Sequence, residues 1–171
     1  VVTFESDECM PDYGMVEINR EKGFSFSCDL KAETIVYGLG EANRGINKRG
    51  YLYISNNTDI PHHHEDAYSL YAAHNFIIVA GEETFGLYID YPSALTFDIG
   101  YTRSDRLHIF CERADLDLYV ITGDTPYDIT KQFRKVIGRS YIAPKFAFGF
   151  GQSRWGYKTP EDFITVVKKY R

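Results

Sequence analysis

Residues 146–157 constrain the fold of this chain more than any other segment. The first five alternate phenylalanine with alanine or glycine. A short apolar run of this kind predicts a strand that is buried on both faces, as in a parallel sheet or barrel. Thr159, Pro160 and Asp162 then predict a helix start with Thr159 as N-cap. Together they predict one strand–loop–helix unit, and the loop of such a unit lies where these folds meet ligands. The polar and aromatic residues of this loop are Gln152, Ser153, Arg154, Trp155 and Tyr157.

The helix predicted after residue 159 has an apolar stripe without a partner. The stripe recurs at helical spacing, and the chain stops at Arg171 with no glycine or asparagine to end the helix. We therefore expect the chain to be a piece of a longer protein, cut in or just after this helix. The stripe consists of Phe163, Val166, Val167 and Tyr170.

Residues 15 to about 120 predict an antiparallel β-sandwich, because short apolar runs alternate with turn residues and helical periodicity is nearly absent. Alternation of apolar and polar residues is clear at residues 115–120. Residues 80–83 predict a hairpin turn. The expected strands span residues 15–18, 24–29, 35–39, 51–54, 75–80, 84–90, 94–99, 106–111 and 116–122.

A helix is predicted after residue 125. Thr125 can cap it, Pro126 takes the first helical position, and Gly138 is placed to end it in the left-handed conformation. The expected buried stripe consists of Ile129, Phe133, Val136 and Ile137.

A linker at residues 139–145, which contains Pro144, separates the predicted sandwich and its helix from the strand–loop–helix unit that begins at residue 146. We predict a sandwich domain over residues 1–143 and the start of a second domain, built from strand–helix units, over residues 144–171.

Composition excludes several classes of partner. The net charge is −5 without a block of lysine or arginine, which argues against nucleic acid and anionic membranes. No apolar run approaches the roughly 20 residues that cross a bilayer. Cys9, Cys28 and Cys111 are odd in number and widely spaced, so neither disulfides nor a zinc site is indicated. We expect reduced thiols, a cytoplasmic protein, and neither metal nor cofactor.

Gly38 and Gly40 end a predicted strand and precede Glu41. Two glycines without a third and without a following helix do not make a phosphate cradle. A tight bend at a corner of the sandwich explains them better. Glu41 either faces a ligand or accepts hydrogen bonds from backbone amides of the loop.

Residues 55–66 form the longest polar stretch, with histidine at positions 62, 63 and 64. Consecutive side chains diverge, so these histidines predict a solvated loop rather than a metal site. Asp59 could accept two hydrogen bonds from neighbouring hydroxyls of a sugar, or it could form a local turn before Ile60 and Pro61.

Trp155 is the single tryptophan of the chain and falls on the predicted ligand-facing loop. Its flat apolar face suits the C–H groups of a sugar ring, and burial against another part of a longer protein is the competing explanation. Arg154 and Gln152 either bind a substrate or brace neighbouring loops.

Several blocks resemble glycoside hydrolase family 31, whose α-glucosidases carry an N-terminal β-sandwich ahead of a (β/α)8 barrel. The blocks are residues 37–41, 71–76, 86–90 and 123–157, and the last of them, with residues 137–139, Pro144 and residues 146–157, is the specific one. The resemblance implies a mainly β chain: an antiparallel, galactose-mutarotase-like supersandwich with one helix. The first strand–helix unit of a truncated catalytic barrel would follow it.

The resemblance also implies a retaining mechanism with an aspartate nucleophile and an aspartate acid/base, both on later barrel strands. No carboxylate of this chain inherits those roles, and we expect the chain alone to be inactive. The expected activity of the whole protein is cleavage of terminal α-linked glucose from oligosaccharides. Asp59 resembles a sandwich-loop aspartate near the leaving-group sugar, Trp155 resembles an aromatic wall of the pocket, and Arg154 is a further candidate for substrate binding.

The expected partners are an oligosaccharide substrate and the rest of the barrel, and a homo-oligomer is left open. Two other functions stay open as well. One is a carbohydrate-binding sandwich without catalysis. The other is a mutarotase-like epimerase, which would need a histidine and a carboxylate to converge on a concave face; His74, His108 and Glu41 show no spacing that establishes this.

Overall fold

The computed structural model describes residues 9–10, 14–19 and 23–171. Contacts within the chain divide it into two compact units, Val1–Gly138 and Arg139–Arg171. The predicted boundary at residue 143 lies a few residues inside the second unit. That this second unit begins a barrel stays a prediction.

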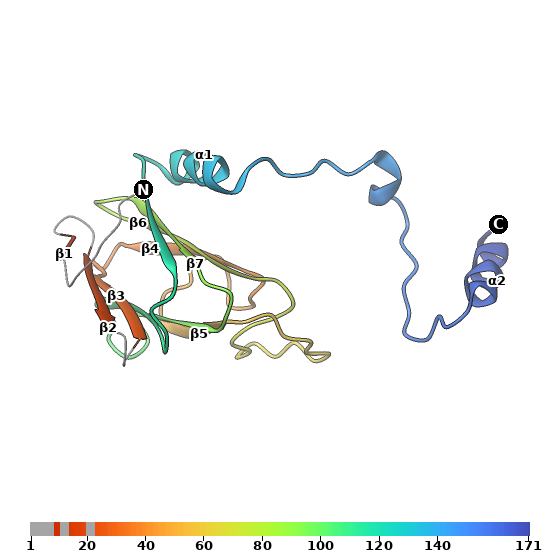
Figure 1. Cartoon of the computed structure of the whole chain (residues 1–171), viewed down its shortest axis with the longest axis horizontal. Coiled ribbons are helices and arrows are strands. Elements are labelled where there is room, and N and C mark those ends of the chain that lie inside the picture. The colour runs from red at the N-terminus through yellow and green to blue at the C-terminus, as the bar shows by residue number, and fades with distance from the viewer. Residues whose placement is uncertain (1–8, 11–13, 20–22) are drawn as a thin grey trace. The chain divides into compact units, whose positions relative to one another are not determined.

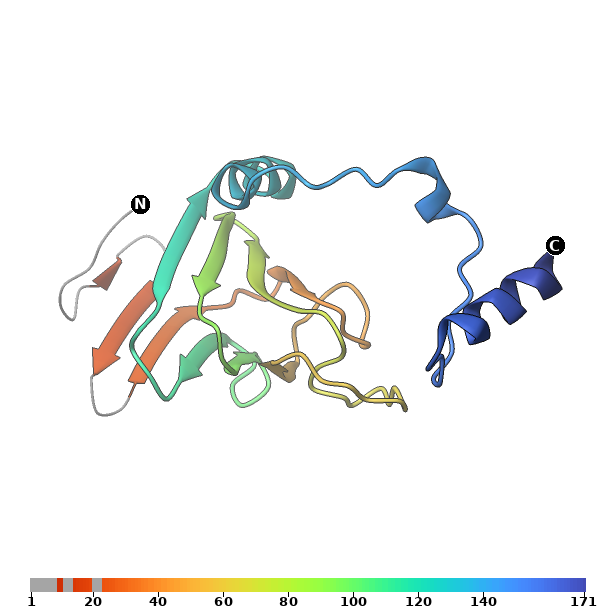
Figure 2. The same cartoon turned by 45° about the vertical axis from the view of Figure 1, so that its right-hand side comes forward.

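The first unit contains, in the part of the chain that is described, two antiparallel sheets that form a sandwich (Figures 1 and 2). One sheet has the strand order β1-β2-β3-β9-β8-β5 and the other has the order β10-β7-β6-β4. The strands are β1 (Cys9–Met10), β2 (Gly14–Asn19), β3 (Gly23–Asp29), β4 (Ile35–Gly40), β5 (Tyr51–Ser55), β6 (Ala73–Ala80), β7 (Phe85–Asp90), β8 (Leu95–Ile99), β9 (Arg106–Cys111) and β10 (Asp117–Thr122).

The antiparallel sandwich predicted from the alternating pattern is confirmed. Each of the nine expected strands is present with its ends shifted by at most two residues, and β1 is an addition. The predicted hairpin after residue 80 joins β6 to β7.

The main core lies between the two sheets and is built from inward-facing residues of both. In the six-stranded sheet, Phe26, Ile109 and Phe97 are directly opposed across β3, β9 and β8, and none of them is exposed. Leu118 and Val120 of β10 pack against this core, as the alternation predicts. The outer face of the six-stranded sheet is therefore free to carry function or to meet solvent.

Cys28 and Cys111 are free thiols in the sandwich. Burial, followed by the charge of Asp29, raises the pKa of Cys28 to about 12. Cys28 is therefore protonated and unreactive at neutral pH. The side chain of Cys9 lies outside the described residues.

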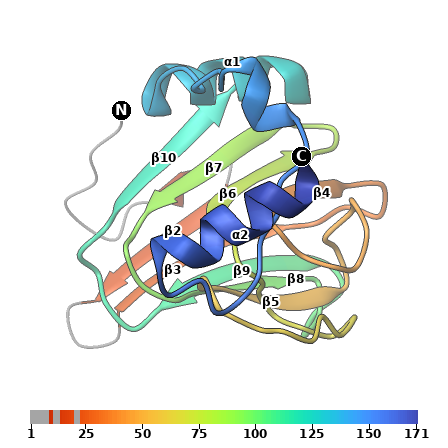
Figure 3. The same cartoon turned by 90° about the vertical axis from the view of Figure 1, so that its right-hand side faces the viewer.

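Helix α1 (Pro126–Ile137) packs across β10, β7 and β6, on the outer side of the four-stranded sheet (Figure 3). Thr125 caps it by accepting a hydrogen bond from the Asp128 amide at 3.2 Å. Ile129 is fully buried and lies so close to Gly86 that a Cβ there would come within 2.5 Å of its Cγ2 atom. Phe133 stacks on Phe76 with ring centroids 3.9 Å apart.

The predicted buried stripe of α1 is wrong at its C-terminal end. Val136 and Ile137 are 46% and 55% exposed, because the packed residues of the helix end at Phe133. Gly138 does end the helix with a positive φ of 87°. Its ψ of −169° is extended, so the predicted left-handed helical conformation is not the one adopted.

The buried strand predicted at residues 146–150 is wrong. Residues Lys145–Phe148 form a 3-10 helix, η1, and Phe146, Phe148 and Phe150 are 76% to 83% exposed. A parallel strand needs neighbouring strands for its backbone hydrogen bonds, and none of the described strands pairs with this segment. The apolar residues alone do not determine its conformation.

The predicted start of helix α2 (Pro160–Tyr170) is confirmed. Thr159 accepts a hydrogen bond from the Asp162 amide, and the Asp162 carboxylate accepts one from the Thr159 amide at 2.9 Å, which completes a capping box. Hydrogen bonds that the Asp162 carboxylate accepts from the backbone amides of Lys158 and then Thr159 lower its pKa. Phe163 stacks on Tyr157, with ring centroids 4.6 Å apart.

We expect Thr159→Ala to destabilise α2 by about 1 kcal/mol, because it removes the capping acceptor. Amide hydrogen exchange of α2 should become about fivefold faster. Thr165→Ala, in the middle of the same helix, is the matched control. Equal exchange rates in both variants would show that the capping box contributes nothing.

Candidate functional site

The candidate site is the loop of residues 56–72, which joins β5 to β6 and carries Asp59. Its two arms are hydrogen-bonded to each other. The Thr58 amide donates to the Leu70 carbonyl at 2.9 Å, and the Ser69 hydroxyl donates to the Asn56 carbonyl. The Ala67 amide donates to the His64 carbonyl at 3.1 Å within the loop. The loop is therefore a folded structure that can hold side chains in fixed positions.

Asp59 is exposed and interacts with the hydroxyl of Tyr71, near the other end of the loop. Desolvation raises the pKa of Tyr71, and the charge of Asp59 together with a hydrogen bond to it raises the pKa further. His63 packs edge-on against the Tyr71 ring, with ring centroids 5.5 Å apart. The loop thus places a carboxylate, a phenol and an imidazole together.

The Asp59 carboxylate retains acceptor capacity beyond the bond from Tyr71, since an ionised carboxylate has about four acceptor positions. Tyr71 is 47% exposed and offers an apolar ring face next to this acceptor. An acceptor beside an apolar face suits a ligand that has hydroxyl groups on a C–H framework.

Arg44 attaches the loop to the sandwich. Its Nε donates to the Glu65 carbonyl and its Nη2 to the Asp66 carbonyl, both at 2.9 Å. Its Nη1 donates to the Leu52 carbonyl of β5 at 3.2 Å, and its own amide donates to the Glu65 carboxylate at 2.9 Å. Its guanidinium lies 4.6 Å from the centre of the Tyr51 ring. One side chain therefore connects the loop to a strand.

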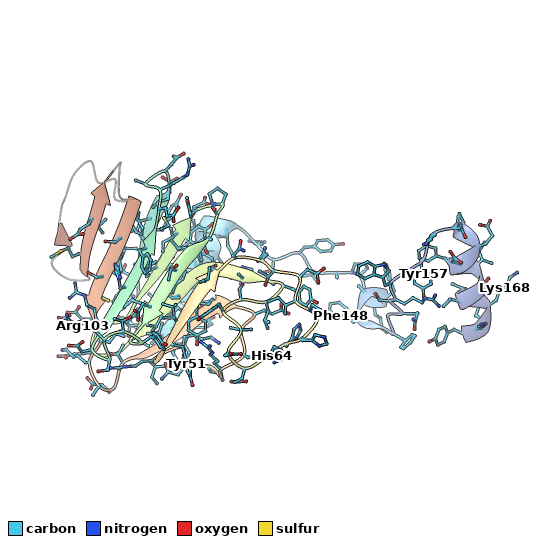
Figure 4. All side chains as sticks on the ribbon, turned by 90° about the horizontal axis from the view of Figure 1, so that it is seen from below. Tyr51, His64, Arg103, Phe148, Tyr157 and Lys168 are labelled. Atoms are coloured by element: carbon cyan, nitrogen blue, oxygen red, sulfur yellow. The ribbon has the colours of Figure 1, made fainter. Side chains whose placement is uncertain are left out.

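Arg44 and its neighbour Asn43, which donates to the His64 carbonyl at 2.8 Å, are the site residues that the sequence did not identify. Figure 4 labels Tyr51, whose ring the Arg44 guanidinium contacts, and His64, whose carbonyl accepts from Asn43. Arg44 adopts a positive φ of 63° in its turn. This conformation is uncommon for residues other than glycine, so the sequence does not predict it at an arginine.

Glu41 takes the structural role of the two that we considered. Its carboxylate accepts a hydrogen bond from the Ala72 amide at 3.1 Å, and its own amide donates to the Ala72 carbonyl at 2.8 Å. The predicted bend before it is confirmed: the β4–β6 register shifts between Gly38 and Gly40, and Leu39 has a φ of 69°. The bend directs the chain after β4 toward the loop, where Glu41 bonds to Ala72.

A hollow of about 460 Å³ lies at the base of the loop, beside β6 and β7. Two of the side-chain amides that line it form hydrogen bonds within the protein. The Asn75 side chain donates to the Tyr91 carbonyl at 3.0 Å and accepts from Ser55, and Asn57 accepts from the Ala73 amide at 2.7 Å. The polar residues that line it include Asn56, His74, Tyr88 and Asp90.

Arg154 and Trp155 belong to the second unit. Trp155 is 97% exposed, and the Arg154 guanidinium lies 5.6 Å from the centre of the Tyr157 ring. Gln152 accepts a hydrogen bond from the hydroxyl of Tyr170 in α2 at 2.9 Å. Because Asp59 lies in the other unit, a pocket shared with Arg154 and Trp155 stays a prediction.

Within the described part of the chain, no group of three histidine, cysteine, aspartate or glutamate side chains could hold a metal ion. None of the helices described is long and apolar enough to cross a membrane.

Residues 7–98 match the family model of the glycosyl hydrolase 31 N-terminal galactose mutarotase-like domain. The chain is 33% identical over 137 residues to alpha-glucosidase 2 of Bacillus thermoamyloliquefaciens, which covers 78% of the chain and 17% of that protein. It is 37% identical over 70 residues to an alpha-xylosidase of Saccharolobus solfataricus, covering 40% of the chain and 10% of that protein.

Solved structures show the same fold. A dextranase of Flavobacterium johnsoniae in complex with isomaltotriose superposes with a TM-score of 0.77 at 21% identity. This match covers 96% of the chain and 20% of the dextranase. The chain thus spans about a fifth or less of the length of the curated relatives described above.

Proposed function

The chain belongs to glycoside hydrolase family 31, through its N-terminal galactose mutarotase-like domain, and from this membership we infer that the whole protein is an α-glucosidase-type glycoside hydrolase. Its expected substrates are oligosaccharides with terminal α-linked glucose. The identity to an alpha-glucosidase over most of the chain supports glucose, and the shorter match to an alpha-xylosidase makes xylose the competing sugar.

The proposed reaction is retaining hydrolysis. One carboxylate attacks the anomeric carbon and forms a glycosyl-enzyme ester, while a second carboxylic acid protonates the departing oxygen and then activates water. Both groups are expected on barrel strands that follow this chain. The chain itself contributes loops that bind and orient the substrate, which affects rate through positioning.

The observation that carries this role is the folded loop with Asp59 beside Tyr71, attached to β5 by Arg44. A carboxylate held on such a loop can accept hydrogen bonds from two neighbouring hydroxyls of the leaving-group sugar. Tyr71 would pack against the C–H face of the same sugar. Trp155 forms the pocket wall in this proposal, and Arg154 donates to substrate hydroxyls.

We expect Asp59→Ala in the full-length protein to raise KM for a disaccharide about tenfold, because a hydrogen bond to a charged acceptor is lost. An aryl α-glucoside lacks the leaving-group sugar, so its KM should change little. Asp66→Ala is the matched control, since Asp66 is exposed on the same loop and contacts Arg44 through its backbone carbonyl. Unchanged disaccharide kinetics would remove Asp59 from the proposed site.

We expect the 171-residue chain alone to release no product from an aryl α-glucoside, because the two catalytic carboxylates are assigned to other parts of the protein. A chromogenic assay of the purified chain tests this. Turnover that persists through further purification would assign catalysis to residues of this chain and would overturn the proposed division of roles.

A further inference from the structure

The outer face of the six-stranded sheet contains a hollow of about 530 Å³ that the proposed function does not use. Residues of β2, β3, β9, β8 and β5 line it, and Arg103, labelled in Figure 4, lies at the turn beside it. Its volume falls in the range of small-molecule sites, about 300 to 1,000 Å³. The polar groups of the hollow include Glu17, Ser25, Ser27, Asp98, Arg106 and His108.

The strand register brings these side chains together in two neighbouring rows. In one row, Ser27 and Asp98 lie directly opposite His108 from its two sides. In the next row, Ser25 lies opposite both Glu17 and Phe110. Because side chains two residues apart on a strand share a face, the two rows line one surface.

Part of this surface is already engaged within the protein. Asp98 accepts hydrogen bonds from the amides of Tyr101 at 2.9 Å and Thr102 at 3.1 Å. Arg106 donates to the Ser27 hydroxyl at 2.7 Å and lies 3.6 Å from the Asp29 carboxylate. These contacts hold the side chains that shape the hollow. They also engage the charged groups of Asp98 and Arg106 within the protein, so neither is free to pair with a charged ligand.

The backbones of Glu17, Ser25 and His108 belong to the sheet, but their side chains make no hydrogen bond to another described residue. His108 packs on Phe110 with ring centroids 4.8 Å apart, and desolvation lowers its pKa. Asp98 and Glu17 oppose this shift, and Arg106 adds to it. At neutral pH the imidazole is therefore uncharged and offers one donor and one acceptor. Together with the Glu17 carboxylate and the Ser25 hydroxyl, it lies beside the partly exposed ring of Phe110.

We propose that this hollow binds a neutral oligosaccharide, with a sugar ring against Phe110 and its hydroxyls bonded to Glu17, Ser25 and His108. The mixture of donors and acceptors suits hydroxyl groups, which both donate and accept. Two carboxylates, Glu17 and Asp98, and two guanidiniums, Arg103 and Arg106, line the hollow, so the formal charges balance and favour a neutral ligand over an ion of either sign.

The test uses the full-length protein in native gels that contain dextran. The unmodified protein should be retarded relative to a gel without dextran. Phe110→Ala should weaken this retardation about tenfold, since it removes the apolar face of the site, and Glu17→Gln should weaken it by a smaller factor. Tyr127→Ala is the matched control: it removes an exposed aromatic from α1, which packs on the other sheet, and should leave retardation unchanged.

Retardation of Phe110→Ala equal to that of the unmodified protein would overturn the inference, and so would the absence of retardation in the unmodified protein. If Phe110→Ala does not fold, Glu17→Gln decides, because Glu17 is exposed and its replacement keeps the side-chain shape. A dimer that dissociates on Phe110→Ala would assign the face to a second copy of the chain and would also overturn the inference. Hydrolysis of an aryl α-glucoside by the unmodified protein tests the proposed function separately.

Discussion

Gly38→Ala should destabilise the sandwich by about 4 kcal/mol, because it adds a clash with backbone to a strained conformation. A Cβ at this position would lie 2.2 Å from the Phe76 carbonyl oxygen and 2.9 Å from the Cα atom of Ile77, and neither atom belongs to a flexible side chain. The φ of Gly38 is 125°, which residues with side chains rarely adopt. Chemical unfolding followed by far-UV circular dichroism measures the change in the free energy of unfolding.

Gly45→Ala is the control that separates the two causes. Gly45 has a positive φ of 67°, but nothing lies within 4 Å of the position that a Cβ would take. We expect this variant to lose about 1 kcal/mol, from backbone conformation alone. If Gly38→Ala were no less stable than Gly45→Ala, the close approach of β4 to β6 would not be essential for the fold.

Arg44→Ala should release the loop of residues 56–72 from the sandwich. The substitution removes three side-chain hydrogen bonds to backbone carbonyls and the contact with Tyr51, and it leaves the part-buried carbonyl of Leu52 without this donor. We expect the free energy that holds the loop closed to fall by about 3 kcal/mol. Hydrogen exchange at the Thr58 amide should then accelerate about a hundredfold, and proteolysis between residues 61 and 66 should become rapid.

The control variants for Arg44 are chosen to separate geometry from charge. Arg44→Lys keeps the positive charge but cannot donate to three carbonyls in a fixed planar arrangement, so it should resemble Arg44→Ala. Arg103→Ala removes an exposed arginine that is paired with Asp105 and should leave the loop unchanged. In the full-length protein, Arg44→Ala should also raise KM for a disaccharide. A loop that stays protected in Arg44→Ala would show that its own hydrogen bonds suffice.

The sandwich was predictable because its strands are bounded by turn residues and alternate in polarity. Leu118 and Val120 show this, since their inward orientation follows directly from the alternation in β10. The helix starts at Thr125 and Thr159 were predictable for a similar reason: a capping residue and the residue three positions later act within one turn.

Features that depend on distant parts of the chain were not predictable. Phe146 and Phe148 were expected in a strand, but a strand requires partners, which the apolar pattern does not supply. Val136 was expected to be buried, but burial depends on where α1 leaves the sheet. The surroundings of His108 became visible only with the register of β3, β8 and β9. The cytoplasmic location and the oligomeric state stay predictions.

The attachment of the loop through Arg44 has a consequence for redesign. Apart from the Glu65 carboxylate, the loop atoms that Arg44 binds are backbone carbonyls, and Asn43 binds a third carbonyl, that of His64. Every amino acid provides a backbone carbonyl, so the side chains at positions 62 to 64 and at 66 can be exchanged without removing a bond that holds the loop. Libraries restricted to these positions could alter which sugars the protein accepts while the loop keeps its anchoring contacts.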